Sequence, residues 1–308
     1  MPKGAFAGLH PVLQLILLIC LVLASSLLVT LIGVLIAIPF WGLDPVVAVL
    51  NGGAPLYFMK YLQLVQSIAM FVVPPVLAAV LFSKSPASWL GFNKPVAKAV
   101  FFAIVIMLVI QPFVSLTSEL NMQFSLPESM DRLMQWMQTT EEAANSLMFS
   151  FLDTTDPVVI LYNIFLIAIV PAVGEELLFR GGIQSLLIRW LKNPHVAIIV
   201  TSILFSAMHM QFLTFLPRFV LGLVLGYLMV YGRSIWYSIM GHFTNNFLSL
   251  VVFHYYRITK PDVNPLDPSQ VGDSQPLLGW AGLVVVLALL YYFRQHNKAR
   301  SEVQVAEV

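Results

Sequence analysis

Long apolar runs separated by short polar stretches fill most of the chain. A helix that crosses a bilayer needs about 20 predominantly apolar residues. Eight runs approach or exceed that length, at 11–40, 56–82, 97–116, 158–189, 196–215, 217–232, 235–254 and 276–293. The pattern predicts an all-α, polytopic membrane protein with about eight transmembrane helices, forming a single membrane domain over residues 1–308.

One polar interruption is much longer than the others. Residues 117–157 contain a single basic side chain, Arg132, against seven acidic ones: Glu119, Glu128, Asp131, Glu141, Glu142, Asp153 and Asp156. Apolar residues recur at helical spacing between Met130 and Phe151, which predicts an amphipathic helix outside the membrane. We interpret this segment as an acidic extracytoplasmic connector, with a lid over a membrane site as the alternative.

Composition agrees with a membrane protein. The 308 residues are 59% hydrophobic and only 10% charged, whereas a soluble domain carries about 25% charged residues. The formal net charge is +1, so the chain lacks the basic field that nucleic-acid binding requires. Cys20 is the only cysteine, which excludes an internal disulfide and a thiolate metal cluster. We expect Cys20 to be buried as a small apolar residue.

Basic residues gather in alternate loops. With eight spans, one side of the membrane receives Lys84, Lys94, Lys98, Arg189, Lys192, Arg233, Arg294, Lys298 and Arg300. The positive-inside rule makes that side the cytoplasm. It therefore places both termini, including the charged tail 294–308, in the cytoplasm. The opposite side receives the segment 117–157 together with Asp44, Asp262, Asp267 and Asp273.

Three ionisable residues interrupt the fourth run, in the stretch PAVGEELLFRGGIQ. Each such group costs a few kcal/mol at the bilayer centre, so it is seldom present without a function. On a helix, Glu176 and Arg180 are four residues apart on one face, with the acid first, which is the favourable order. Glu176 is therefore the natural partner of Arg180, and Glu175, on another face, is available to titrate or to bind a water.

Two later runs carry polar side chains at a comparable depth. His209 lies one helical turn after Phe205, and His242 and Asn246 are four residues apart on one face. Asn245 is close enough in angle that the sequence leaves the choice of amide open. Polar groups in membranes normally face the bundle interior and pair with one another. We interpret 158–254 as the catalytic core helices, rather than as a polar network that only joins helices.

Several familiar motifs are missing or have a plainer explanation. The sequence contains neither His-Glu-x-x-His nor Gly-x-Ser-x-Gly, the signatures of zincin proteases and serine hydrolases. Gly222 and Gly226 have the spacing of close helix packing, and Ser202 and Ser206 are expected to be helix-packing hydroxyls. The other histidines lie near the ends of spans, where we expect interfacial placement: His10, His195, His254 and His296.

The three motifs together carry a family resemblance. Glu175-Glu176-x-x-x-Arg180, Phe205-x-x-x-His209 and His242-x-x-x-Asn246 resemble the motifs of the CAAX-protease and bacteriocin-processing (Abi) family. Its members are intramembrane endopeptidases related to the type II CAAX prenyl endopeptidase. The resemblance covers about residues 170 to 250. It implies an enzyme that hydrolyses a peptide bond in a membrane-associated peptide or lipoprotein.

The resemblance also implies a role for each matching residue. Glu175 matches the base that activates a water, and His209 matches the histidine that helps to hold it. His242 and Asn246 match the pair that stabilises the oxyanion. The supporting positions of the family are matched by Glu176 and Arg180. The expected partners are a membrane-embedded or membrane-associated peptide or protein and the lipid bilayer, without nucleic acid.

Three alternatives remain open. Glu175, His209 and His242 could bind Zn²⁺ with Glu176 as base, but the spacing commits Glu176 to Arg180, whose charge disfavours a dication, so we expect no metal. A transporter should show inverted repeats or paired broken helices, and we find none in the sequence. A non-catalytic immunity protein could carry the same residues.

Short loops and the EELLFRG motif resemble bacterial members, so we expect a bacterial cytoplasmic membrane.

Overall fold

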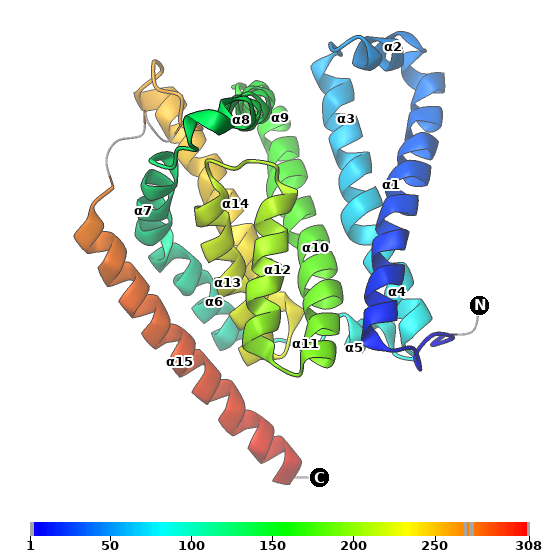
Figure 1. The fold of residues 1–308 in the computed structure, drawn as a ribbon, viewed down its shortest axis with the longest axis vertical. Coiled ribbons are helices and arrows are strands. Elements are labelled where there is room, and N and C mark those ends of the chain that lie inside the picture. Colours follow the sequence, from blue (N-terminus) through cyan, green and yellow to red (C-terminus); the bar gives the residue numbers. More distant parts are fainter. Residues whose placement is uncertain (1–2, 268–269, 271–273, 307–308) are drawn as a thin grey trace. The chain divides into compact units, whose positions relative to one another are not determined.

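A computed structural model describes residues 3–267, 270 and 274–306, with side chains up to Asn297, and the regular elements in these ranges are all helical (Figure 1). Within this part of the chain, six helices are long and apolar enough to cross a membrane: Pro11–Trp41, Leu56–Phe82, Ala97–Met122, Pro157–Leu191, Phe215–Gly232 and Pro276–Asn297. The all-α, polytopic membrane architecture predicted from the sequence is confirmed.

The other two predicted spans are also helices. The apolar helix α12 (Pro194–Met208) has 15 residues and is shorter than a usual span. Helix α14 (Ile235–Thr259) has 25 residues, but its middle is interrupted by polar side chains. The predicted run 196–215 ends early, because the chain leaves the helix at His209 and Met210 adopts a left-handed φ of 53°.

The chain groups into two compact units, Met1–Phe92 with Thr154–Lys192, and Asn93–Asp153 with Asn193–Val308. The first unit begins with α1 (Pro11–Trp41) and α2 (Asp44–Leu50). A second long helix follows as α3 (Leu56–Ser67), η1 (Ile68–Val72) and α4 (Val73–Phe82), and then α5 (Pro86–Trp89). The fourth span comprises α9 (Pro157–Asn163), η3 (Ile164–Ile169), α10 (Val170–Glu176), η4 (Leu177–Gln184) and α11 (Ser185–Leu191).

Three short stretches of the first unit, η1, η3 and η4, are π-helical. The first two directly precede turns that contain proline, Pro74-Pro75 and Pro171. Proline lacks the N–H group that an α-helix needs, which forces the ladder of hydrogen bonds to change spacing. Helix α1 packs closely on this second helix: Tyr61 donates its hydroxyl hydrogen to the Gly33 carbonyl at 2.7 Å, and Ser25 donates to the Ala69 carbonyl at 2.6 Å.

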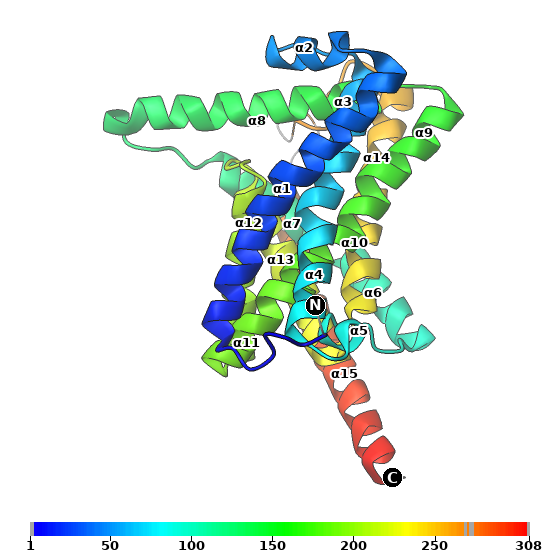
Figure 2. The same cartoon turned by 90° about the vertical axis from the view of Figure 1, so that its right-hand side faces the viewer.

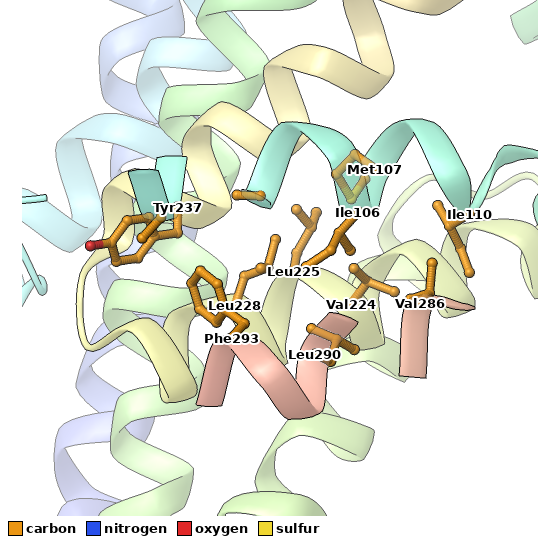
Figure 3. Close-up of a cluster of buried hydrophobic side chains, with 12 residues drawn as sticks. Ile106, Met107, Ile110, Val224, Leu225, Leu228, Tyr237, Val286, Leu290 and Phe293 are labelled. Carbon is orange, nitrogen blue, oxygen red and sulfur yellow. The ribbon is translucent and has the colours of Figure 1, made fainter. Parts of the chain in front are cut away.

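The second unit contains α6 (Ala97–Val109), α7 (Gln111–Met122), η2 (Glu128–Met130), α8 (Asp131–Leu152), α12, α13 (Phe215–Gly232), α14 and α15 (Pro276–Ala306). Figure 3 shows its apolar core, where side chains of α6, α13 and α15 meet beside Tyr237 of α14. The phenol oxygen of Tyr237 accepts a hydrogen bond from the Val96 amide at 3.0 Å, so this buried polar group is satisfied.

The helix predicted in the acidic segment is α8, which has 22 residues. It runs crosswise to α12, α13 and α14 of the same unit (Figure 2). The close packing predicted for the glycine pair is confirmed at Gly222, where an added Cβ would lie 3.0 Å from the Ser202 Cβ of α12. The hydroxyls of Ser202 and Ser206 donate to the carbonyls of Ile198 and Phe215, as expected for helix-packing serines.

The expectation that Cys20 is buried is wrong. Cys20 is exposed on α1, because most of this helix presents apolar side chains outward, as a helix in contact with lipid does. Asp273 and the last two residues of the tail 294–308 lie outside the described residues, as do the side chains of Lys298 and Arg300. The grouping of 1–308 into a single membrane domain stays a prediction.

Candidate functional site

Glu175, Glu176 and Arg180 form the acid set, which lies on the fourth span of the first unit. The two glutamates are the last residues of α10, and Arg180 lies in η4. Glu176 and Arg180 are 0% exposed, and Glu175 is 9% exposed. Nη1 of Arg180 donates to Oε1 of Glu176 at 2.8 Å, which confirms the pairing expected from the spacing. The two buried charges therefore compensate each other within one helical turn.

Two glycines flank the acid set and bring neighbouring helices close to it. A Cβ added to Gly174 would lie 2.9 Å from the Cβ of Phe71 in η1, and one added to Gly182 would lie 3.0 Å from Cδ2 of Leu18 in α1. The rings of Phe71 and Phe179 also meet, with centroids 6.4 Å apart. Since a methyl group would not fit without movement, the sequence around Glu175 and Glu176 is constrained on both sides.

His209, His242 and Asn246 form the histidine set, which lies on α12 and α14 of the second unit. His209 directly follows α12 as its C-cap residue, and its Nδ1 lies 2.8 Å from the carbonyl oxygen of Phe205. A carbonyl only accepts, so Nδ1 carries the hydrogen. In the neutral ring Nε2 is then an acceptor. This is the form that can hold a water through one of its hydrogens.

Phe205 brings the two histidines of this set together. Its ring lies edge-on to both imidazoles, with centroids 5.1 Å from His209 and 5.8 Å from His242. His242 is only 5% exposed. The spacing Phe205-x-x-x-His209 thus has a physical meaning, because the phenylalanine one turn before His209 separates and orients two imidazole rings.

The two asparagines on α14 have different environments. Nε2 of Gln111, at the start of α7, donates to Oδ1 of Asn245 at 3.2 Å. Nδ2 of Asn245 in turn donates to Oδ1 of Asn246 at 3.2 Å. Asn245 therefore joins two helices. Because the oxygen of Asn246 accepts from Asn245, its amide hydrogens point away from Asn245.

The sequence interpretation missed the side chains that hold the turn after His209. Oε2 of Glu141, on α8, accepts from the Leu213 amide at 2.7 Å, and Oε1 accepts from the Thr214 hydroxyl at 2.6 Å. Asn121, on α7, donates to the Phe212 carbonyl at 3.1 Å and accepts from the Leu216 amide at 2.6 Å. The backbone of this turn thus finds its hydrogen-bond partners on α7 and α8.

A second group of contacts completes this network. Asn145 of α8 accepts from Nε2 of Gln211 at 3.0 Å, and Nη2 of Arg218 donates to Oε1 of Gln211 at 2.5 Å. Nη1 of Arg218 also donates to the Thr214 hydroxyl oxygen. The network stabilises the left-handed backbone of Met210 directly after His209, a conformation that costs about 1–2 kcal/mol for a residue with a side chain. The sequence showed that these positions are polar. It did not show their hydrogen-bond partners, because the partners lie far away along the chain.

The structure therefore brings the predicted residues together in two sets, one in each compact unit. Glu176 meets Arg180 in the first, and His209 meets His242 through Phe205 in the second. Within each unit, the part of the chain that is described holds no group of three or more His, Cys, Asp or Glu side chains that could bind a metal ion.

Comparison with known proteins identifies the region that carries both sets. Residues 157–248 match the family described as type II CAAX prenyl endopeptidase Rce1-like. This confirms the resemblance that the three motifs predicted, and it supports a CAAX-type intramembrane protease as the general class of this integral membrane protein. No curated protein and no solved structure matches the chain.

Proposed function

We propose that this protein is an intramembrane endopeptidase that hydrolyses a peptide bond of a membrane-associated peptide or lipoprotein with a water activated by Glu175. The observation that carries the proposal is the Rce1-like match, since residues 157–248 include all six predicted site residues. The name of that family describes cleavage of prenylated CAAX proteins. We accordingly propose a substrate whose cleavage site lies close to a membrane anchor.

The proposed reaction uses the two sets on one peptide bond. Glu175 takes a proton from a water that His209 holds through Nε2, and the water oxygen attacks the carbonyl carbon. Donors on His242 and Asn246 stabilise the resulting oxyanion. The proton held by Glu175 then passes to the amine as the C–N bond breaks. The low exposure of Glu175 and His242 supports this assignment, because oxyanion donors are most effective in a site that excludes water.

The remaining residues have supporting roles in this proposal. We assign Glu176 and Arg180, the buried ion pair, a structural role, and we give the adjacent Glu175 the role of base that the family resemblance implies. Asn245 accepts from Gln111 and donates to Asn246, so we assign the oxyanion role to Asn246 and a positioning role to Asn245. The mechanism uses no metal. The zinc alternative, with Glu175, His209 and His242 as ligands, is tested separately below.

Replacing Glu175 tests the proposal most directly. Glu175→Gln keeps the size of the side chain and removes the base, so we expect cleavage to fall about 10²–10⁴-fold. The measurement is cleavage of quenched CAAX peptides, with and without a farnesyl group, by protein in lipid nanodiscs. Asn246→Ala should lower the rate on the order of 10²-fold through loss of an oxyanion donor.

The matched control is Glu142→Gln, which removes a carboxylate from an exposed position on α8. It should cleave at the rate of the unmodified protein. A folded Glu175→Gln variant with unimpaired cleavage would overturn the proposed role of Glu175. If neither peptide is cleaved, the same pair of variants is compared in cells for accumulation of unprocessed membrane peptides, and equal processing by both would overturn the proposal.

We also propose that both termini face the cytoplasm of a bacterial cell and that α8 lies outside. The alternation of basic and acidic loops supports this orientation. It predicts that a cysteine at the exposed position Thr139 of α8, in a Cys20→Ala background, reacts with a membrane-impermeant maleimide in intact cells. Labelling only after the inner face has been exposed would reverse the orientation.

A further inference from the structure

A second polar site lies in the second unit, away from the histidine set along the helices. A cavity of about 270 Å³ opens where α12 begins and α13 ends, beside α15. We call it the basic pocket and define it by its polar lining residues: His195, Tyr227, Tyr231, Arg233 and Arg294. Pro194, Ile198 and Val230 form its apolar wall. None of these residues has a part in the proposed hydrolysis.

The polar side chains of the basic pocket contact one another. Nδ1 of His195 lies 2.9 Å from the hydroxyl of Tyr227. The guanidinium of Arg294 lies over the ring of Tyr231, 5.3 Å from its centroid. The rings of Tyr227 and Tyr231 are one turn apart on α13, with centroids 5.2 Å apart. The aromatic residues therefore position hydrogen-bonding groups and a cation on one side of the cavity.

The lining of this pocket, as far as the structure describes it, is positively charged. Its lining includes two arginines and no acidic residue. Among the described residues, no carboxylate forms an ion pair with Arg233 or Arg294, whereas Arg257 of the same unit pairs with Asp153 at 2.7 Å. Two guanidinium groups with a histidine and two phenols form a donor set typical of sites that bind phosphate.

The place of the pocket along the helices indicates the source of the phosphate. Arg233 directly follows the span Phe215–Gly232, and Arg294 lies near the end of the span Pro276–Asn297. His195 is the second residue of α12, so it also lies at a helix end. Because these spans end together, we place the pocket at the level of the lipid headgroups.

An apolar stripe continues from the pocket along α12. Val196, Ile199 and Ile203 are exposed, and their spacing of three and four residues places them on one face of the helix. The stripe begins beside His195. A ligand that carries both groups would place its phosphate in the pocket and its hydrocarbon chain on the stripe. Free phosphate would occupy the pocket and leave the apolar stripe uncovered.

We propose that the basic pocket binds the phosphate diester of an anionic phospholipid, with an acyl chain along the stripe of α12. Basic pockets between helices near an anionic leaflet bind lipid headgroups in this way. Binding needs no cleavage, so this inference can fail or succeed independently of the proposed endopeptidase activity.

The test measures lipid retention by native mass spectrometry of the full-length protein. The protein is extracted from nanodiscs that contain equal parts of phosphatidylglycerol and phosphatidylcholine. The unmodified protein should retain phosphatidylglycerol preferentially. In the double variant Arg233→Asn, Arg294→Gln, its affinity should fall on the order of 10²-fold, because each lost charge-assisted hydrogen bond to the phosphate contributes about a factor of ten. Asparagine suits position 233, where φ is 55°.

The matched control is Arg132→Gln with Lys260→Gln, which removes two exposed positive charges from the same unit, on α8 and just after the last residue of α14, away from the pocket. Its affinity for phosphatidylglycerol should stay within about twofold, since diffuse attraction is screened over about 8 Å at physiological salt. Equal losses in both double variants, or no preference for phosphatidylglycerol in the unmodified protein, would overturn the proposal.

Two further measurements keep the test decisive. Tyr227→Phe preserves every charge and removes only the hydroxyl, so a smaller loss of affinity is expected even if the double variant does not fold. Inorganic phosphate is then titrated against the retained lipid. Displacement of phosphatidylglycerol only by a large excess of phosphate supports a lipid ligand. Displacement at equal concentrations would identify free phosphate as the ligand and overturn the lipid assignment.

Discussion

Glu176 and Arg180 pair within one turn of a single span, whereas His209 depends on side chains that lie far away in the chain. The turn after His209 is held by Asn145 and Glu141, which precede their partners by 66 residues or more. The acid set is thus arranged by local helix geometry, and the histidine set by contacts between elements. The difference determines which substitutions should disturb each set.

Burial separates the two sets as well. The ion pair of the acid set is excluded from solvent, and glycines bring η1 and α1 against its helix. His209 is only partly buried and Met210 is exposed, with a left-handed backbone. The acid set should therefore be sensitive to charge and volume, and the histidine set to the polar network that anchors its turn.

The largest expected effect follows from breaking the ion pair. Glu176→Gln or Arg180→Gln removes this ion pair and leaves one of its two buried charges behind, which typically costs about 3–5 kcal/mol. Each single variant should therefore give a much lower yield of folded protein and a lower melting temperature in detergent. The double variant Glu176→Gln, Arg180→Gln should recover part of this loss, because neither charge remains.

The comparison between the two sets would fail if the double variant were no better folded than either single one. In that case the two residues would be held mainly by other neighbours, and the acid set would depend on long-range contacts as well. Asp153→Asn is the matched control, since it breaks the exposed ion pair with Arg257, and exposed pairs contribute about 0–1 kcal/mol.

The acid set could be predicted from the sequence because the spacing of its residues follows the period of an α-helix. The spacing of Glu176 and Arg180 on a helix predicts their contact, and the 2.8 Å distance confirms it. Apolar runs likewise predicted the helices, since burial in lipid requires them to be continuous. The early end of α12 was missed because nothing in the apolar run 196–215 signals that Met210 leaves the helix.

The side chains that support the histidine set could not be identified from the sequence, because their contacts do not follow the period of a helix. Glu141 is one of seven acidic residues in 117–157, and its spacing does not distinguish it from the exposed Glu142. Only the folded chain shows that Glu141 is buried and accepts from Leu213 and Thr214. Gln111 was passed over for the same reason, because its contact with Asn245 joins residues 134 positions apart.

Glu141→Gln gives the next largest expected effect. The substitution replaces a charged acceptor with an amide, and hydrogen bonds to charged groups contribute about 1.5–3 kcal/mol. We expect faster hydrogen exchange at the Leu213 amide and a fall in kcat of roughly ten- to a hundredfold through displacement of His209. Hydrogen–deuterium exchange and peptide cleavage, both measured below the melting temperature, would report these changes.

Glu142→Gln, one residue along the same helix, should change neither quantity, because Glu142 is exposed. If Glu141→Gln speeds exchange at Leu213 but leaves kcat unchanged, α8 anchors the turn without positioning His209. If it changes neither, the turn is held locally, and the contrast between the acid set and the histidine set disappears. Either result would contradict the positioning role of Glu141.

The smallest expected effect is that of removing metal ions. The proposal divides the work between the sets, with a base from the acid set and a water holder and oxyanion donors from the histidine set. A zinc ion held by Glu175, His209 and His242 would erase this division, because residues of both sets would become ligands of one centre. Arg180 adds a positive charge beside Glu176, which disfavours a dication nearby.

We therefore expect cleavage to stay within about twofold after exhaustive chelation, since general-base catalysis by a carboxylate needs no metal. Metal analysis of the active protein should find no stoichiometric zinc, with the Glu175→Gln variant as the inactive reference. One tightly bound zinc per chain, with activity lost on its removal and restored on its return, would make Glu175 a ligand and assign the base to Glu176. The endopeptidase assignment would survive that result. The ion pair would then have to open during catalysis, and Arg180→Gln would be expected to change the pH profile of kcat as well as the yield of folded protein.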